Sequence, residues 1–242
     1  MLKLIIPFLP LFAFSEASAM NVLITGANRG IGLEFARHYK ERGYTVIGTA
    51  RNLDQATELK ALGVRVELLD VADASSIAAL KQRLANVPLD IVINNAGVLE
   101  GKNATLETLN FDDFAKSFAI NSTAPIRVTQ ALLPNLRAGK QKKIINITSQ
   151  LGSIQDNSGG YYPYRASKAA LNQLTKTMSL ELEKENFICI VMHPGWVKTD
   201  MGGPMAPITP KQAVQAMLTI IDGLDKSSNG RYLDLHGNSI PW

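Results

Sequence analysis

Short apolar runs alternate with helical stretches from Asn21 onward, and this alternation constrains the fold more than any other feature. Because the runs are apolar throughout and are separated by helices, they indicate a parallel sheet covered on both faces. We predict one α/β domain over residues 20–242, doubly wound, with a mostly parallel seven-stranded sheet and helices on both faces. The predicted strands are residues 22–25, 44–49, 64–69, 89–93, 143–147, 187–192 and 231–235. The predicted helices are residues 30–43, 54–62, 74–84, 122–136, 164–184 and 210–224.

The composition is that of a globular protein and excludes several kinds of site. Hydrophobic residues make up 46% of the chain and charged residues 19%, with a formal net charge of +4. No run of lysines and arginines is interleaved with aromatic residues, so we expect no nucleic-acid partner. The one cysteine, Cys189, excludes an internal disulfide framework and a cysteine-rich metal site, and we predict no bound metal. Its apolar neighbours predict a buried, inert thiol.

A glycine-rich turn joins the first predicted strand to the first predicted helix. Residues 25–32 read Thr-Gly-Ala-Asn-Arg-Gly-Ile-Gly, with Gly26, Gly30 and Gly32 at the glycine positions. Glycines allow a tight turn and let backbone N–H groups approach a diphosphate, which the positive end of the helix also attracts. The spacing differs from the commoner Gly-x-Gly-x-x-Gly, and an ordinary glycine-rich connection is the alternative. The strand before the turn and the helix after it favour a Rossmann-type dinucleotide site.

The end of the second predicted strand indicates which dinucleotide binds. A free ribose 2′-hydroxyl is usually met there by Asp or Glu, whereas a 2′-phosphate requires arginine. Here the strand is followed by Arg51, with no acid before Asp54, and Arg29 can reach the same phosphate from the glycine turn. Either arginine alone is typical of a surface charge, but the two together predict NADP.

Polar residues follow other predicted strands at the same edge of the sheet, where ligands of such folds bind. Asp70 ends the third strand and suits either an adenine amino group or a turn. Residues 94–97, Asn-Asn-Ala-Gly, offer amides and a close backbone to a ribose, or they close the sheet. Ser149 can hydrogen-bond a substrate carbonyl, although serines at strand ends are usually turn formers.

Tyr164 and Lys168 are four residues apart at the start of a predicted helix, so the phenol and the ammonium project from one face. A phenol has an ordinary pKa of about 10, and a positive charge nearby lowers that pKa. The pair therefore suits general acid/base catalysis, with the pKa of Tyr164 lowered by Lys168. Alone, this spacing is typical of a solvated helix surface. The neighbouring motifs favour the catalytic interpretation.

Six ordered motifs resemble those of the short-chain dehydrogenase/reductase superfamily, and the resemblance spans residues 21–242. They are the glycine turn, residues 94–97, Asn121, Ser149, the pair Tyr164 and Lys168, and Pro194-Gly195. More narrowly, residues 164–172, residues 193–203 and the closing Ile-Pro-Trp are similar to the C-factor and sniffer-type carbonyl reductase branch.

The resemblance implies four catalytic residues. Ser149 polarises the carbonyl and Tyr164 donates the proton. Lys168 holds the nicotinamide ribose and lowers the pKa of the tyrosine. Asn121 supports a water-mediated proton relay to this lysine.

The gap from Ser149 to Tyr164 is longer than the commonest in the superfamily. Thr148 and Ser153 are therefore rivals to Ser149. In the implied cofactor site, Thr199 is the hydroxyl ligand of the nicotinamide amide. The predicted cofactor-binding residues are Gly26, Asn28, Arg29, Gly30, Ile31, Gly32, Arg51, Asp70, Val71, Asn95, Ala96, Gly97, Tyr164, Lys168, Pro194, Gly195, Val197 and Thr199.

We therefore predict an NADP-dependent oxidoreductase that transfers a hydride from NADPH to a ketone or aldehyde carbonyl, with Tyr164 as general acid. The alternative is an NADP-binding signalling or regulatory protein of C-factor type with little physiological turnover; the complete catalytic set weighs against it. Tyr161, Tyr162 and Trp196 either line a fairly apolar substrate pocket or serve ordinary packing. Superfamily members are often dimers or tetramers, which makes a homo-oligomer an expectation, although no interface is readable.

Residues 1–19 stand apart from the predicted domain. An apolar stretch, residues 4–14, is too short to span a bilayer, and Ala-Ser-Ala at 17–19 resembles a signal-peptidase site. The segment is either a cleaved export signal or an extension upstream of a true start at Met20. We favour Met20 and the cytoplasm, because NADP is maintained mainly inside cells. The glycosylation sequons at Asn121 and Asn146 also fall on presumed site and strand positions.

Overall fold

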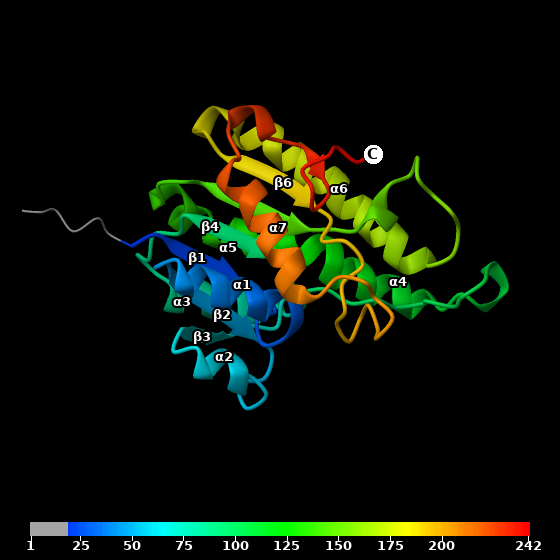
Figure 1. The fold of residues 1–242 in the computed structure, drawn as a ribbon, viewed down its shortest axis with the longest axis horizontal. Coiled ribbons are helices and arrows are strands. Elements are labelled where there is room, and N and C mark those ends of the chain that lie inside the picture. The colour runs from blue at the N-terminus through cyan, green and yellow to red at the C-terminus, as the bar shows by residue number, and fades with distance from the viewer. Residues whose placement is uncertain (1–18) are drawn as a thin grey trace, which may run out of the picture.

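The computed structural model describes residues 19–242, and its strands form one sheet in which every neighbouring pair is parallel (Figure 1). The strand order is β3-β2-β1-β4-β5-β6-β7, so the predicted doubly wound seven-stranded sheet is confirmed. The proposed signal or extension lies almost wholly outside the described residues. The strands are β1 (Asn21–Ile24), β2 (Thr45–Ala50), β3 (Arg65–Leu68), β4 (Ile91–Asn94), β5 (Lys143–Ile147), β6 (Ile188–Met192) and β7 (Tyr232–Leu233).

Helices cover both faces of the sheet, as predicted. The helices α1, α2 and α7 pack on one face, and α3, α5 and α6 pack on the other. Figure 1 shows α1 and α7 side by side in front of the strands. The helices are α1 (Gly30–Glu41), α2 (Thr57–Ala61), α3 (Ala74–Arg83), α4 (Phe111–Phe118), α5 (Ala124–Ala138), α6 (Tyr162–Leu182) and α7 (Pro210–Asp222).

Alternation along each strand divides the core into two layers. In β1, Val22 and Ile24 face the layer under α1 and α7, while Leu23 faces the opposite layer. In β6, Ile190 belongs to the first layer and Cys189 to the second. Cys189 is fully buried, and burial raises the pKa of its thiol to about 12. Because both faces are covered, the strands are apolar on both sides, which explains their continuous hydrophobic runs.

The helix predicted at residues 122–136 is part of a longer helical stretch. It begins at α4, where Asn110 caps the first turn by accepting a hydrogen bond from the Asp112 N–H at 3.0 Å. A π-helical segment, Ala119–Thr123, then joins α4 to α5. The predicted start at residue 122 was wrong, because α5 begins at Ala124 after the π segment, with Pro125 in its first turn.

The loops that follow the strands gather at one edge of the sheet. Figure 1 shows the connections after β4, β5 and β6 at the same end of the molecule. Parallel strands place all their carboxyl ends on one side, so residues far apart in sequence meet there. Within residues 19–242, no helix has the length and apolar character needed to cross a bilayer.

Candidate active site

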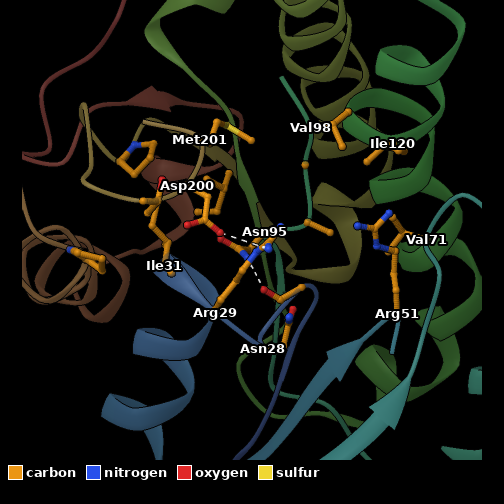
Figure 2. Close-up of a pocket in the computed structure, with 18 of the residues that line it drawn as sticks. Asn28, Arg29, Ile31, Arg51, Val71, Asn95, Val98, Ile120, Asp200 and Met201 are labelled. Carbon is orange, nitrogen blue, oxygen red and sulfur yellow. Dashed lines mark hydrogen bonds and ion pairs between the residues drawn. The ribbon is translucent and has the colours of Figure 1, made fainter. Parts of the chain in front are cut away.

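A cavity of about 500 Å³ opens at this edge, between the glycine turn, the ends of β2, β4 and β5, the start of α6 and the loop after β6 (Figure 2). Most of the residues predicted to bind a cofactor line it. They are Gly26, Asn28, Arg29, Gly30, Ile31, Arg51, Asp70, Val71, Asn95, Ala96, Gly97, Tyr164, Lys168, Pro194 and Thr199.

The glycine turn has the conformation that a dinucleotide site needs. Gly26 and Gly30 adopt φ of +64° and +57°, in the left-handed region that favours glycine. A Cβ on Gly32 would overlap the carbonyl oxygen of Gly26, so the helix can approach the turn only with glycine there. Arg29 is the N-cap residue of α1, and its side chain makes no capping hydrogen bond within the described part of the chain. The positive end of α1 therefore faces the cavity and fits a diphosphate.

Hydrogen bonds hold the glycine turn against the end of β4. The Thr25 hydroxyl oxygen accepts from the N–H groups of Asn95 (3.0 Å) and Ala96 (3.1 Å). In return, the Asn95 amide donates to the carbonyls of Thr25 (3.0 Å) and Gly26 (3.1 Å). Asn94 instead closes the sheet, because its amide donates to the Asn146 side chain at 2.8 Å in the core. Asn94 thus closes the sheet, while Asn95, Ala96 and Gly97 line the cavity, where the predicted contact with a ribose stays a prediction.

Figure 2 shows the two arginines predicted for one phosphate pointing to different parts of the cavity. Arg29 reaches the loop after β6, where its Nη1 lies 3.2 Å from Oδ2 of Asp200. Arg51 stands beside Val71 at the ends of β2 and β3. Asp70 lines the cavity and also forms a turn, accepting from the Ala72 N–H at 2.9 Å.

Tyr164 and Lys168 are both buried on the first turns of α6. The Lys168 ammonium lies 5.8 Å from the centroid of the Tyr164 ring and donates to the Ile147 carbonyl at 2.9 Å. The Ser149 hydroxyl accepts from the Leu151 N–H at 3.2 Å and adjoins the Tyr164 phenol, whose pKa it tends to lower. The end of β5 and the start of α6 therefore bring a hydroxyl, a phenol and an ammonium together.

Burial dominates the ionisation of this pair. Burial raises the pKa of Tyr164 to about 12, although the hydrogen bond with Ser149 opposes the rise. Burial also lowers the pKa of Lys168 to about 8. The expectation that Lys168 lowers the pKa of Tyr164 was wrong for this structure, because the surroundings of both groups disfavour their charged forms. The phenol therefore keeps its proton at neutral pH.

Asn121 lies in the π-helical segment, and its side chain is fully engaged. Its oxygen accepts from the Val98 N–H at 2.8 Å, and its NH₂ donates to the Val98 carbonyl (2.9 Å) and the Ser167 hydroxyl (3.0 Å). A Cβ on Gly97 would lie 3.2 Å from the Asn121 oxygen and 3.7 Å from Lys168 Nζ. Asn121 and Lys168 thus meet around a glycine that leaves space between them.

The rivals of Ser149 are occupied elsewhere. Thr148 donates to the Asn172 side-chain oxygen at 2.7 Å. Ser153 donates to the Trp242 carbonyl at 3.4 Å and accepts from the Asp156 N–H at 3.1 Å. Thr148 lines the cavity and Ser149 does not, but of the three hydroxyls Ser149 is the one that adjoins the Tyr164 phenol.

Some predicted residues lie behind the cavity wall. A Cβ on Gly195, whose φ is +82°, would meet the side chains of Leu235 and Ile208 at 2.5 and 2.7 Å. Val197 is buried and forms a bridge with Ile208. These two residues shape the loop after β6 and do not line the cavity. The predicted residues outside its lining are Gly32, Asn121, Ser149, Gly195 and Val197.

The cavity also contains residues that the sequence analysis missed. Several adjoin a recognised motif: Val98 follows Gly97, and Asp200 follows Thr199. The unpredicted lining residues are Asn52, Gln55, Leu69, Val98, Ile120, Ile147, Lys198, Asp200, Met201 and Pro210. The aromatic residues expected near a substrate lie nearer the surface. Trp196 is 56% exposed and donates to the Gly202 carbonyl at 2.8 Å, so it is not a core residue.

Comparison with known proteins identifies the family. The family model described as short chain dehydrogenase matches residues 20–207. The chain belongs to this family. The predicted resemblance is thereby confirmed, and this short-chain dehydrogenase is of the oxidoreductase class.

Its relatives include proteins of the branch that the sequence predicts. It is 46% identical to the C-signal protein of Myxococcus xanthus over 156 residues, which cover 64% of this chain and 93% of the relative. The NADPH-bound carbonyl reductase from chicken fatty liver has a TM-score of 0.85 and 34% identity, covering 93% of this chain and 99% of that one. The carbonyl reductase Sniffer of D. melanogaster has a TM-score of 0.86 and 31% identity, covering 93% and 100%.

Proposed function

We propose that this short-chain dehydrogenase reduces a ketone or aldehyde with NADPH, with Tyr164 as the general acid. The observation that carries the proposal is the placement of the Tyr164 phenol and the Lys168 ammonium on the wall of the cavity, with the Ser149 hydroxyl beside the phenol. A general acid must lie within reach of the carbonyl oxygen and carry a proton there. The likeness to an NADPH-bound carbonyl reductase supports the same reaction.

Two features support NADP over NAD. Arg51 follows β2 and lines the cavity, and no carboxylate occupies its position. An arginine there suits a 2′-phosphate, whereas an Asp or Glu would suit a free 2′-hydroxyl. Arg29 adds positive charge from the glycine turn, although it shares that charge with Asp200.

Each catalytic residue has a separate task in the proposed reaction. NADPH, when bound, supplies the hydride that adds to the carbonyl carbon. Tyr164 gives its proton to the carbonyl oxygen as negative charge develops there, and Ser149 holds that oxygen by a hydrogen bond. Lys168 contributes positive charge and binds the ribose hydroxyls. Asn121, whose side-chain amide is held by Val98 and Ser167, would support the relay by fixing the π-helical segment beside Lys168.

The direct test measures NADPH and NADH consumption by residues 20–242 with quinones, aldehydes and ketones. We expect turnover that prefers NADPH. Tyr164→Phe should keep NADPH affinity and lose about 10²- to 10⁴-fold in turnover, the usual worth of general acid catalysis. Unchanged turnover in Tyr164→Phe would show that another group donates the proton.

A signalling function is the second candidate, and the identity to C-signal favours it specifically. In that case NADP occupancy, read by a partner, would matter more than turnover. Tight NADPH binding without consumption on any carbonyl of the panel would favour this function.

We also propose that residues 20–242 form the functional unit, since the family match begins at residue 20. The start at Met20 and the cytoplasmic location stay predictions. Its partner is a small carbonyl compound, and a homo-oligomer remains a prediction. Gel filtration of the 20–242 protein checks the oligomer, and fractionation of the producing cells checks the location.

A further inference from the structure

Tyr232, on the edge strand β7, contacts the main chain of Ser149. The Tyr232 hydroxyl donates to the Ser149 carbonyl at 2.5 Å. The same carbonyl accepts from the Gly152 N–H at 2.8 Å. Tyr232 is only 2% exposed, and it does not line the cavity. The Tyr232 phenol therefore contacts the main chain of Ser149 from the side away from the cavity.

The phenol is suited to a permanent donor role. Burial raises the pKa of Tyr232 above its ordinary value, so the hydroxyl remains a donor at neutral pH. A buried carbonyl that loses one of its donors is left with weaker hydrogen bonding, and the segment that carries it can shift.

Tyr232 is itself fixed by the segment that ends in Trp242. The two rings have centroids 5.4 Å apart. The Trp242 main-chain oxygen accepts from the N–H groups of Ile154 (3.2 Å) and Gln155 (3.1 Å). Residues 149–155 are thus held at both ends. The Tyr232 hydroxyl bonds the Ser149 carbonyl, and the Trp242 main-chain oxygen bonds the N–H groups of residues 154 and 155.

We propose that Tyr232 is a positioning residue for carbonyl reduction: its hydrogen bond to the Ser149 carbonyl holds the Ser149 hydroxyl on the Tyr164 phenol. The inference rests on the proposed function. Ser149 has an extended backbone, with φ of −149° and ψ of +149°, so the direction of its side chain follows the orientation of the peptide that Tyr232 holds. Displacements of about 1 Å in such groups can cost about 10²-fold in rate.

The first test compares Tyr232→Phe with Tyr39→Phe. Tyr39 is also fully buried, but it lies on α1 and its hydroxyl has no hydrogen-bond partner among residues 19–242. We expect Tyr232→Phe to lower kcat about 10-fold without changing the Kd for NADPH. We expect Tyr39→Phe to change neither quantity. An unchanged kcat in Tyr232→Phe would overturn the inference while leaving the proposed function intact.

A double-mutant cycle separates positioning from a general structural effect. If Tyr232 acts through Ser149, then adding Tyr232→Phe to Ser149→Ala should cause no further loss of kcat. A full additional 10-fold loss in the double variant would mean that Tyr232 acts by another route, and would overturn the inference.

Hydrogen exchange gives a readout that needs no turnover. The Gly152 amide is bonded to the carbonyl that Tyr232 holds, so the peptide covering residues 149–155 should exchange faster in Tyr232→Phe and not in Tyr39→Phe. If the wild-type protein reduced no carbonyl, the proposed function would fail, and this measurement would still decide whether Tyr232 fixes Ser149. Equal exchange in all three proteins would overturn the inference.

Discussion

At the scale of single residues, charge and burial decide what each side chain can do. Arg51 is the clearest case, because the proposed preference for NADP rests on its guanidinium. A charged hydrogen-bonding pair contributes about 1.5–3 kcal/mol, which corresponds to roughly 10- to 100-fold in binding.

We therefore expect Arg51→Gln to reduce the preference for NADPH over NADH by about 10- to 100-fold, with KM for both cofactors as the measurement. Arg37→Gln is the matched control, since it removes the same charge from α1, where Arg37 pairs with Glu34. An equal loss for both cofactors in Arg51→Gln would mean that this residue does not read the 2′-phosphate.

Lys168 links catalysis to stability. Its pKa falls from 10.5 to about 8 in the folded protein, so the fold disfavours the charged ammonium at pH 7. Lys168→Met removes that cost and the hydrogen bond to Ile147, and we expect a net gain of about 1–3 kcal/mol in unfolding free energy at pH 7.

The gain should depend on pH with a definite sign. Between pH 8 and 10.5 the unfolded wild-type chain holds the Lys168 proton and the folded protein does not, so wild-type stability from this group rises with pH. In urea unfolding, the gain in unfolding free energy from Lys168→Met should therefore be smaller at pH 10 than at pH 7. A constant advantage at both values would mean that the lysine does not titrate in this window.

At the scale of elements, the glycine turn and α1 fit only without a side chain at Gly32. Gly32→Ala would force a methyl group against the Gly26 carbonyl, and we expect a loss of about 1–3 kcal/mol together with weaker NADPH binding. Gly223→Ala is the control, because φ is −80° there and the nearest contact of an added Cβ is 3.7 Å. Thermal unfolding and NADPH titration of both variants check this. Equal melting temperatures and equal NADPH affinities in the two variants would show that the glycine turn can shift to accept the methyl group.

The helices and strands could be predicted where a local hydrophobic pattern marks them. They were harder to predict where contacts between distant residues determine the structure. The apolar runs of these strands are followed by polar residues, so residues such as Arg51, Asp70 and Asn95 could be assigned to one edge before the structure was known. Helix α4 was missed because much of its stability comes from packing on α6.

Contacts across the sheet have no local signal. The bond from Tyr232 to Ser149 joins residues 83 positions apart, and no spacing rule connects them. The ion pair of Arg29 with Asp200 likewise depends on how the loop after β6 returns over the glycine turn. The pKa of Tyr164 was wrongly anticipated for the same reason: helical spacing gives the position of Lys168, but burial follows from the whole fold.

At the scale of the whole molecule, the two core layers hold the sheet and leave the active-site edge to its loops. Leu132 on α5 is fully buried in the layer opposite α1, far from the cavity lining. We expect Leu132→Ala to cost about 2–5 kcal/mol in urea unfolding, with kcat unchanged below the melting temperature.

The matched control is Leu180→Ala on α6, where the side chain is 61% exposed and the cost should stay within about 0.5 kcal/mol. Similar losses in the two variants would mean that the leucine in α5 is less tightly packed than its burial indicates.

The burial of Cys189 has a chemical consequence if the protein reduces carbonyl compounds as proposed. Quinones and unsaturated aldehydes alkylate thiolates, and many proteins are inactivated by such electrophiles through exposed cysteines. This chain carries one cysteine, enclosed in β6 with a pKa near 12, so almost no thiolate is present to react. The fold therefore protects this thiol from alkylation by carbonyl compounds of the proposed substrate class.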